Sequence, residues 1–107
     1  MTDQPGAARF TVTLAAGDEP PTVVVSGDLD LANVAEFEEA MAGALDGAPA
    51  LTIDLTGVTY CDSAAVRALF ALAATTQLTM VVRQTGHIKT LLGISGLDRV
   101  ATVVTKE

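Results

Sequence analysis

Asp62 and Ser63 are the residues of this chain whose types and spacing most directly suggest chemistry. They stand side by side in CDSAA (Cys61–Ala65), where a strand-like run gives way to a helix-like run. Either side chain can cap the helix, because both accept hydrogen bonds from the free N–H groups of a first helical turn. Ser63 can also be a nucleophile, or a site that another protein modifies. The pair therefore leaves three roles open: cap, nucleophile and modification site.

A serine nucleophile requires a base, and His87, the one histidine of the chain, is the candidate. A nucleophile elbow carries glycine two residues before and two residues after its serine. Those positions hold Cys61 and Ala65 here, and no oxyanion loop is evident. The sequence therefore argues against an enzyme, and one that uses Ser63 and His87 stays only a third hypothesis.

Residues that could hold a metal or a cofactor are sparse. The chain has one His and one Cys, so it cannot supply the sets of His and Cys ligands that bind zinc. Asp28, Asp30 and Asp62 could surround a divalent cation, but such acids are more often helix caps or solvated loop residues. Neither a Walker A pattern nor GxGxxG occurs. We therefore predict neither a metal nor a cofactor.

Modification of Ser63 is physically reasonable. A serine in the first turn of a helix presents its hydroxyl outward, at the electropositive end of the helix dipole. A phosphate there would be tolerated by the fold and would add roughly -1.5 to -2 charge beside Asp62. Such a change alters the surface without unfolding the domain, which suits a binding switch.

The pattern of apolar residues predicts the elements that position this pair. Alternating or β-branched runs are typical of strands, and apolar residues at intervals of three or four are typical of helices. Asp30 is the predicted N-cap of the first helix, whose apolar face begins at Leu31, and Gly93 is the predicted stop of the third. The predicted strands are Phe10–Leu14, Thr22–Gly27, Ala50–Leu55, Leu78–Val82 and Arg99–Thr105, and the predicted helices are 31–45, one starting at about Ser63, and 86–93.

The predicted order is β-β-α-β-α-β-α-β, an α/β fold. Strand-helix-strand units give parallel neighbours through right-handed crossovers, and the alternating strands indicate a mixed sheet with its helices mainly on one face. Loops after parallel strands gather at one edge of such a sheet. Those loops are 27–30, 56–63 and 83–87, and they should bring together Asp28, Asp30, Asp62, Ser63 and His87.

Composition bounds the class of protein. The chain of 107 residues fits one small domain, and its net charge of -7 disfavours contact with nucleic acid or anionic lipid. Cys61 is the only cysteine, which fits a reducing compartment. Residues 1–8 read as a disordered tail without signal-peptide features. No apolar run approaches the ~18 residues that span a bilayer, so we expect a cytoplasmic protein with no direct membrane insertion.

Three stretches together resemble a known family. LTIDLTGVTYCDSAAVRALFALAA (51–74) is similar to the signature of the STAS domain, and more narrowly to that of the bacterial anti-sigma factor antagonists. VVSGDLDLANVAEFEEAM (24–41) resembles the Gly-Glu-Leu-Asp loop and following helix of that family, and GHIKTLLGISGLDRVATV (86–103) resembles its short helix, turn and last strand. The resemblance spans about residues 9 to 105, so we expect one STAS domain over 9–107.

The resemblance implies a non-enzymatic binding protein that acts on transcription. Unphosphorylated, it would bind an anti-sigma factor that is also a serine kinase, and so free the sigma factor. The kinase would use ATP to phosphorylate Ser63, and the product would no longer bind. The protein would be a monomer or weak dimer. The predicted partner-binding residues are Asp28, Asp30, Asp62, Ser63, Ala64, Ala65 and Arg67.

The sequence departs from the family pattern after the serine. Ala64 and Ala65 stand where the family usually has Ser or Thr and then Gly. A methyl group at position 65 could narrow what docks at the helix start. This departure motivates a second hypothesis: a STAS interaction module without a phospho-switch, such as a stress-complex component or a soluble subunit of a lipid or anion transport complex.

Overall fold

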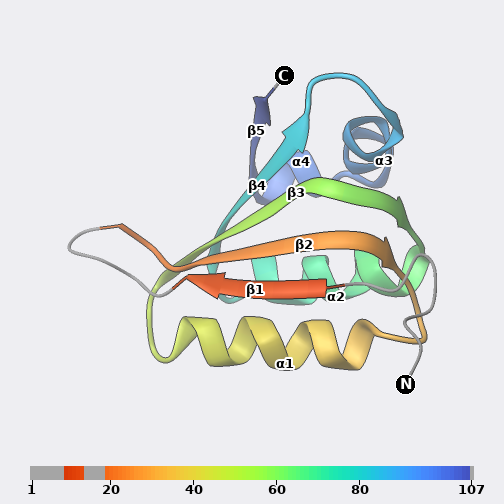
Figure 1. Ribbon diagram of the computed structural model, residues 1–107. Coiled ribbons are helices and arrows are strands. Elements are labelled where there is room, and N and C mark those ends of the chain that lie inside the picture. The colour runs from red at the N-terminus through yellow and green to blue at the C-terminus, as the bar shows by residue number, and fades with distance from the viewer. Residues whose placement is uncertain (1–8, 14–18, 107) are drawn as a thin grey trace.

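A computed structural model describes residues 9–13 and 19–106 of the chain (Figure 1). The predicted tail, 1–8, and Leu14 lie outside the described residues. The elements, in chain order, are β1 (Arg9–Thr13), β2 (Thr22–Leu29), α1 (Val34–Leu45), β3 (Ala50–Cys61), α2 (Ser63–Ala73), β4 (Gln77–Arg83), α3 (His87–Ser95), α4 (Leu97–Val100) and β5 (Thr102–Lys106).

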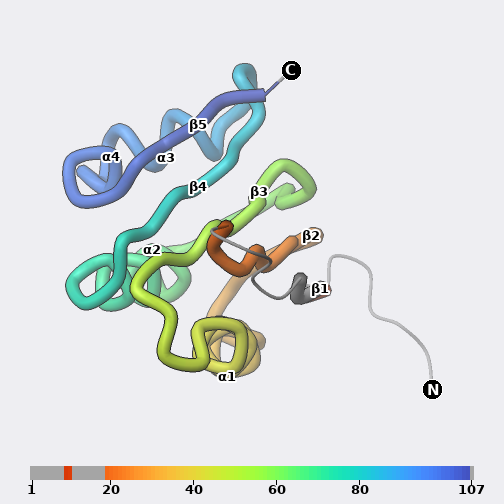
Figure 2. The backbone as a smooth tube through the Cα atoms, turned by 90° about the vertical axis from the view of Figure 1, so that its left-hand side faces the viewer, coloured from red at the N-terminus to blue at the C-terminus, as the bar shows by residue number. Residues whose placement is uncertain are grey.

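The strands form one five-stranded mixed sheet in the order β1-β2-β3-β4-β5. β1 is antiparallel to β2, and the other neighbours are parallel. α1 lies beside the β1–β2 half of the sheet, and α3 and α4 lie beside the β4–β5 half (Figure 2). The predicted fold class is confirmed, with α4 as an added short helix before the last strand.

The helices cover one face of the sheet, and side chains along the strands accordingly alternate between buried and more exposed positions. Val23, Ile53 and Met80 are paired in register across three strands, and all three are fully buried. Their neighbour Val24 points to the opposite face and is 37% exposed. The buried face packs against Phe37 of α1 and other apolar helix residues. Each such large side chain contributes about 1.5–3 kcal/mol when buried.

β3 is longer than the sequence predicts. The sequence predicts a loop over 56–63, but the strand continues to Cys61, because β2 also continues to Leu29 and the two strands stay paired through register shifts. Gly57 stands at the shift, where a Cβ would lie 3.0 Å from the Cβ of Ser26. A glycine there allows the close approach of the two strands. The predicted loop over 56–63 was therefore wrong.

The start of α1 also differs from the prediction. Asp30 does not cap the helix; its Oδ1 accepts the N–H of Ala32 at 3.0 Å, and the helix begins only at Val34. Asp side chains commonly bond to the backbone two residues on, and this closes a turn rather than starting a helix. Leu31 consequently lies in the turn, 74% exposed, and not on the apolar face.

The third helix runs past Gly93. α3 ends at Ser95, and Gly96 follows with a φ of 87°. This left-handed conformation favours glycine, so the helix stops at Gly96 and not at the predicted Gly93. Arg99, predicted to start the last strand, belongs to α4 instead. None of the helices in the described ranges is long and apolar enough to cross a membrane.

Candidate functional site

Asp62 joins two elements that are distant in the sequence. It follows β3 and precedes α2, and its Oδ1 accepts the N–H of Ala65 at 3.1 Å. Its Oδ2 accepts the N–H of Leu31 at 3.0 Å. One carboxylate therefore caps α2 and also holds the turn between β2 and α1. Of the two candidate caps, Asp62 fills the role and Ser63 does not.

Ser63 is the first residue of α2, and its side chain is exposed. Within the described residues its hydroxyl makes no hydrogen bond. Because Asp62 already satisfies the helix start, the hydroxyl of Ser63 is available to solvent. It lies at the positive end of the helix dipole, where an added anion is favoured.

The other acidic residues lie at the same edge as Asp62. The carboxylate of Asp28 accepts the hydroxyl of Thr59 at 2.6 Å, which ties the end of β2 to β3. The N–H of Asp30 donates to Oδ1 of Asn33, and the N–H of Asp62 donates to the carbonyl of Leu29. The predicted edge thus gathers Asp28, Asp30 and Asp62.

His87 makes no hydrogen bond to these acidic residues within the described part of the chain. No hydrogen bond joins it to Ser63 in the described part of the chain. It lies at the start of α3 and lines a separate cavity with Gly57 and Thr59 of β3. The described residues therefore hold no base that is hydrogen-bonded to Ser63, and the nucleophile hypothesis gains no support from them.

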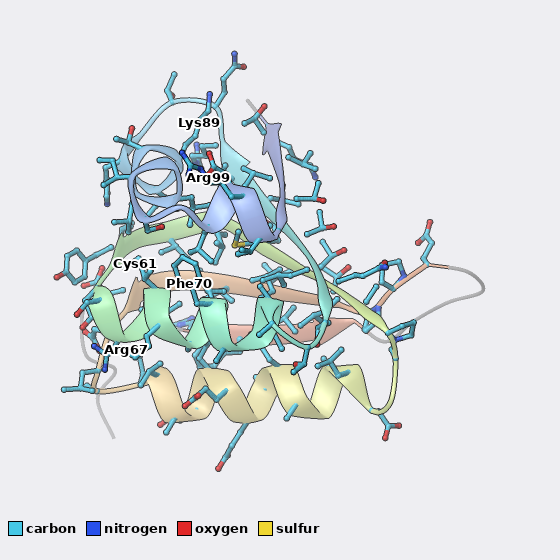
Figure 3. All side chains as sticks on the ribbon, turned by 180° about the vertical axis from the view of Figure 1, so that it is seen from behind. Cys61, Arg67, Phe70, Lys89 and Arg99 are labelled. Carbon is cyan, nitrogen blue, oxygen red and sulfur yellow. The ribbon has the colours of Figure 1, made fainter. Side chains whose placement is uncertain are left out.

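Ala64, Ala65 and Arg67, which the sequence predicts to bind a partner, differ in their exposure to solvent. Ala65 is fully buried in the hydrophobic core, so its methyl group faces inward and a docking partner does not meet it. Ala64 is half-buried. Arg67 is exposed and extends outward from α2 (Figure 3), one turn after Ser63 on the same side of the helix.

The sequence does not predict two exposed apolar side chains that lie at this edge. Leu31 is 74% exposed and Tyr60 is 50% exposed, and both are close in sequence or by hydrogen bond to Asp62. Large apolar side chains surrounded by polar groups are typical of interaction surfaces. For Leu31, the sequence signal for exposure is Asp30, whose side chain closes a turn and so keeps Leu31 outside the helix. For Tyr60, the only signal is its residue type, since it is the one tyrosine of the chain.

The thiol of Cys61 is unsuited to chemistry. Burial raises its pKa to about 11, and the adjacent Asp62 charge adds to the effect. Because the thiolate is the reactive form of cysteine, Cys61 is an inert thiol at neutral pH. Among the side chains that the structure describes, no group of three or more His, Cys, Asp or Glu residues could hold a metal ion.

Comparisons with known proteins agree with this fold. The family model described as "Mlab, STAS domain" matches residues 12–105. An anti-sigma factor antagonist from Mycobacterium paratuberculosis aligns with a TM-score of 0.82 at 25% identity, covering 98% of this chain and 92% of that chain. A Thermotoga maritima protein, proposed to be such an antagonist, aligns at 0.72 and 15% identity, covering 91% and 86%, and this match supports the fold alone. No curated protein matches the chain.

Proposed function

The chain belongs to the STAS domain family, and from that premise we propose that it is an anti-sigma factor antagonist switched off by phosphorylation of Ser63. The observation that carries the proposal is that Asp62 and Ser63 have different roles at the start of α2. Asp62 caps the helix and Ser63 is exposed beside it. A phosphate on Ser63 would therefore change the surface and leave the cap in place.

The partner in this proposal is an anti-sigma factor that is also a serine kinase and supplies ATP. It would dock on the edge formed by Asp28, Asp30, Leu31, Tyr60, Asp62, Ser63, Ala64 and Arg67, which we call the switch edge. Three carboxylates against one arginine make this edge acidic, so a basic patch on the partner is the complementary surface.

The remaining expectations follow from the same proposal. The domain comprises residues 9–107, acts in the cytoplasm as a monomer or weak dimer, and makes no contact with nucleic acid. It is not an enzyme, which the inert Cys61 thiol and the lack of a hydrogen bond between His87 and Ser63 in the described residues support.

Incubation with ATP and the cognate kinase tests the modification. We expect mass spectrometry to find a single phosphate on Ser63, because its hydroxyl is exposed and makes no hydrogen bond within the described residues. The Ser63→Ala variant serves as control and should remain unmodified. Recovery of wild-type protein without phosphate on Ser63 would overturn the switch.

Truncation of the apolar side chains on the switch edge should weaken docking. We expect Leu31→Ala and Tyr60→Ala each to reduce affinity for the partner about tenfold, since exposed apolar anchors commonly contribute over 1 kcal/mol when an interface buries them. Calorimetric titration measures the loss. Ile94→Ala on α3, where the side chain is 80% exposed, is the matched control. Equal affinity of Leu31→Ala and Ile94→Ala would exclude Leu31 from the interface.

A constitutive STAS interaction module without a phospho-switch is the second candidate. It would be a stress-complex component or a subunit of a lipid or anion transport complex. The presence of Ala65 in place of the family glycine favours it, although the burial of that methyl group removes the steric objection to a kinase partner. Co-purification with membrane components, and no sigma-regulating partner, would favour this candidate.

A further inference from the structure

A cavity of about 340 Å³ lies between the second half of β3 and the start of α3. Figure 1 shows α3 beside the end of β3, at the edge where β4 also ends. The cavity is separate from the switch edge in its lining, because it contains neither Asp62 nor Ser63. Its lining residues are Leu55, Thr56, Gly57, Val58, Thr59, Arg83, Thr85, Gly86, His87, Ile88 and Lys89.

The charge of this lining is opposite to that of the whole protein. The chain carries 13 acidic residues and six Lys or Arg. The cavity is nevertheless lined by Arg83, His87 and Lys89 and by no acidic residue. Within the described residues, no ion pair neutralises Arg83 or Lys89. A positive concave surface of this kind attracts small anions.

Arg83 is held in a defined orientation. Its Nε donates to the carbonyl of Thr56 at 2.8 Å, which fixes the guanidinium against β3. The two remaining guanidinium nitrogens carry N–H groups that are free to bind an oxyanion, and a planar guanidinium can present two of them in parallel. A fixed orientation lowers the entropy lost on binding. Arg83 is therefore suited to bind a phosphate in two-point geometry.

Backbone donors add to the three side chains. α3 begins after Gly86, and no side chain caps it, so the N–H groups of its first turn have no acceptor within the helix. Lys89 and His87 belong to that same turn. An oxyanion in the cavity could therefore accept from backbone and side chain together.

Two nearby carboxylates limit the position of the ligand. The hydroxyl of Thr56 donates to Asp54 at 2.6 Å, and that of Thr59 donates to Asp28 at 2.6 Å. These two hydroxyls are therefore occupied, and the negative charges behind them repel an anion on the β3 side. The anionic group is expected against Arg83 and the α3 turn.

The floor of the cavity is apolar. Leu55, Val58 and Ile88 line it and are at most 7% exposed. A bare inorganic ion would fill only a small part of a cavity of about 340 Å³, whereas an organic group attached to a phosphate would occupy the rest of it, above these side chains. The volume lies at the low end of the roughly 300–1,000 Å³ typical of ligand pockets, which restricts the organic group to a small one.

We propose that this cavity binds a small phosphomonoester, with its phosphate held by Arg83, Lys89 and the first turn of α3. His87 lies at the entrance to the same turn and adds a further donor. The site does not overlap the proposed phospho-switch, because none of its lining residues belongs to the switch edge; the hydrogen bond from Thr59 to Asp28 is the contact between the two.

Titration with phenyl phosphate tests the site. We expect saturable shifts of the backbone amide signals of Gly57, Gly86 and Ile88 in nitrogen-15 NMR spectra, and weaker binding of inorganic phosphate, which lacks the apolar group. Phenol, which lacks the charge, should produce no saturation at the same concentrations. Phenol binding as tightly as phenyl phosphate would overturn the proposal, because the basic residues would then have no role.

Matched variants assign the binding to the basic residues. Arg83→Gln and Lys89→Gln should each weaken phenyl phosphate binding about tenfold, as expected for the loss of a charge-assisted hydrogen bond. Both side chains are exposed, so both variants should fold. Arg99→Gln removes one exposed positive charge on α4 and should bind as wild type. A similar loss of affinity for phenyl phosphate in all three variants would mean that the anion is attracted non-specifically by positive charge, and it would contradict the proposal.

A lipid headgroup could present the same phosphate chemistry. Vesicles of phosphatidic acid distinguish this source, because a membrane surface cannot enter a cavity of this size. We expect phenyl phosphate to bind and the vesicles not to sediment the protein. Sedimentation with vesicles, lost in Arg83→Gln, without any binding of phenyl phosphate would overturn the small-molecule site.

Discussion

Replacement of Ser63 by aspartate or glutamate is expected to weaken binding of the anti-sigma factor kinase about tenfold or more. Ser63 is exposed at the first position of α2, between the capping Asp62 and Arg67. In a formed interface the basic groups of the partner are already paired with Asp28, Asp30 and Asp62, so the added carboxylate would be buried without a partner, which costs several kcal/mol. Ser63→Ala adds no charge and should stay folded and competent to bind.

The comparison needs a variant with the same added charge elsewhere. Gln77→Glu adds one carboxylate at the exposed start of β4, the opposite end of the sheet from the switch edge. Calorimetric titration of the partner should give wild-type affinity for Gln77→Glu and for Ser63→Ala. Equal weakening by Gln77→Glu and Ser63→Asp would attribute the effect to net charge and not to the switch. Wild-type affinity of Ser63→Asp would leave the constitutive module as the better description.

The layered fold could be predicted because it follows from the spacing of apolar residues within each strand and helix. In β2 and β3, residues alternate between a buried face and a half-exposed face, and the register pairs Val23 with Ile53 as the pattern requires. The helices were found for the same reason, since Phe37 and Met41 recur on one buried face of α1. Parallel pairing then follows from the length of the connections between strands.

The errors lie where distant residues decide the local structure. Thr56 and Gly57 suggest a loop, yet β2 continues beside them and extends β3 to Cys61. No local pattern encodes that pairing, because each strand end is held only by the other. Asp30 is a similar case: its side chain accepts the N–H of Ala32, and the distant Asp62 accepts the N–H of Leu31 and so holds the same turn.

The candidate site was only partly accessible from sequence. The Asp62–Ser63 pair could be found, because a cap and a free hydroxyl in adjacent positions are local features. Leu31 and Tyr60 could not, since their exposure depends on the turn at Asp30 and on the extension of β3. The sequence did not predict the burial of Ala65 either. Because this side chain is buried, the replacement of the family glycine by alanine affects packing in the core and not the docking surface.

Removal of the Asp62 side chain is expected to act on stability and on binding at once. Asp62→Ala loses the cap of α2, which typically lowers the free energy of unfolding by about 0.5–2 kcal/mol, and it also releases the N–H of Leu31. The turn that carries Leu31 would then be free to move relative to Ser63. Urea denaturation measures the loss of stability, and hydrogen exchange at the Leu31 amide measures the release of the turn.

Asp62→Asn separates the two roles. An asparagine keeps one acceptor oxygen, so it can retain the cap or the bond to Leu31 but not both. Because asparagine is as good an N-cap as aspartate, we expect this variant to keep nearly wild-type stability while the Leu31 amide exchanges faster. Its affinity for the partner should then fall as it does for Leu31→Ala, since both changes remove the same anchor. Unchanged exchange at Leu31 in both Asp62 variants would contradict the coupling between the turn and the helix start, and with it the idea that the switch edge acts as one surface.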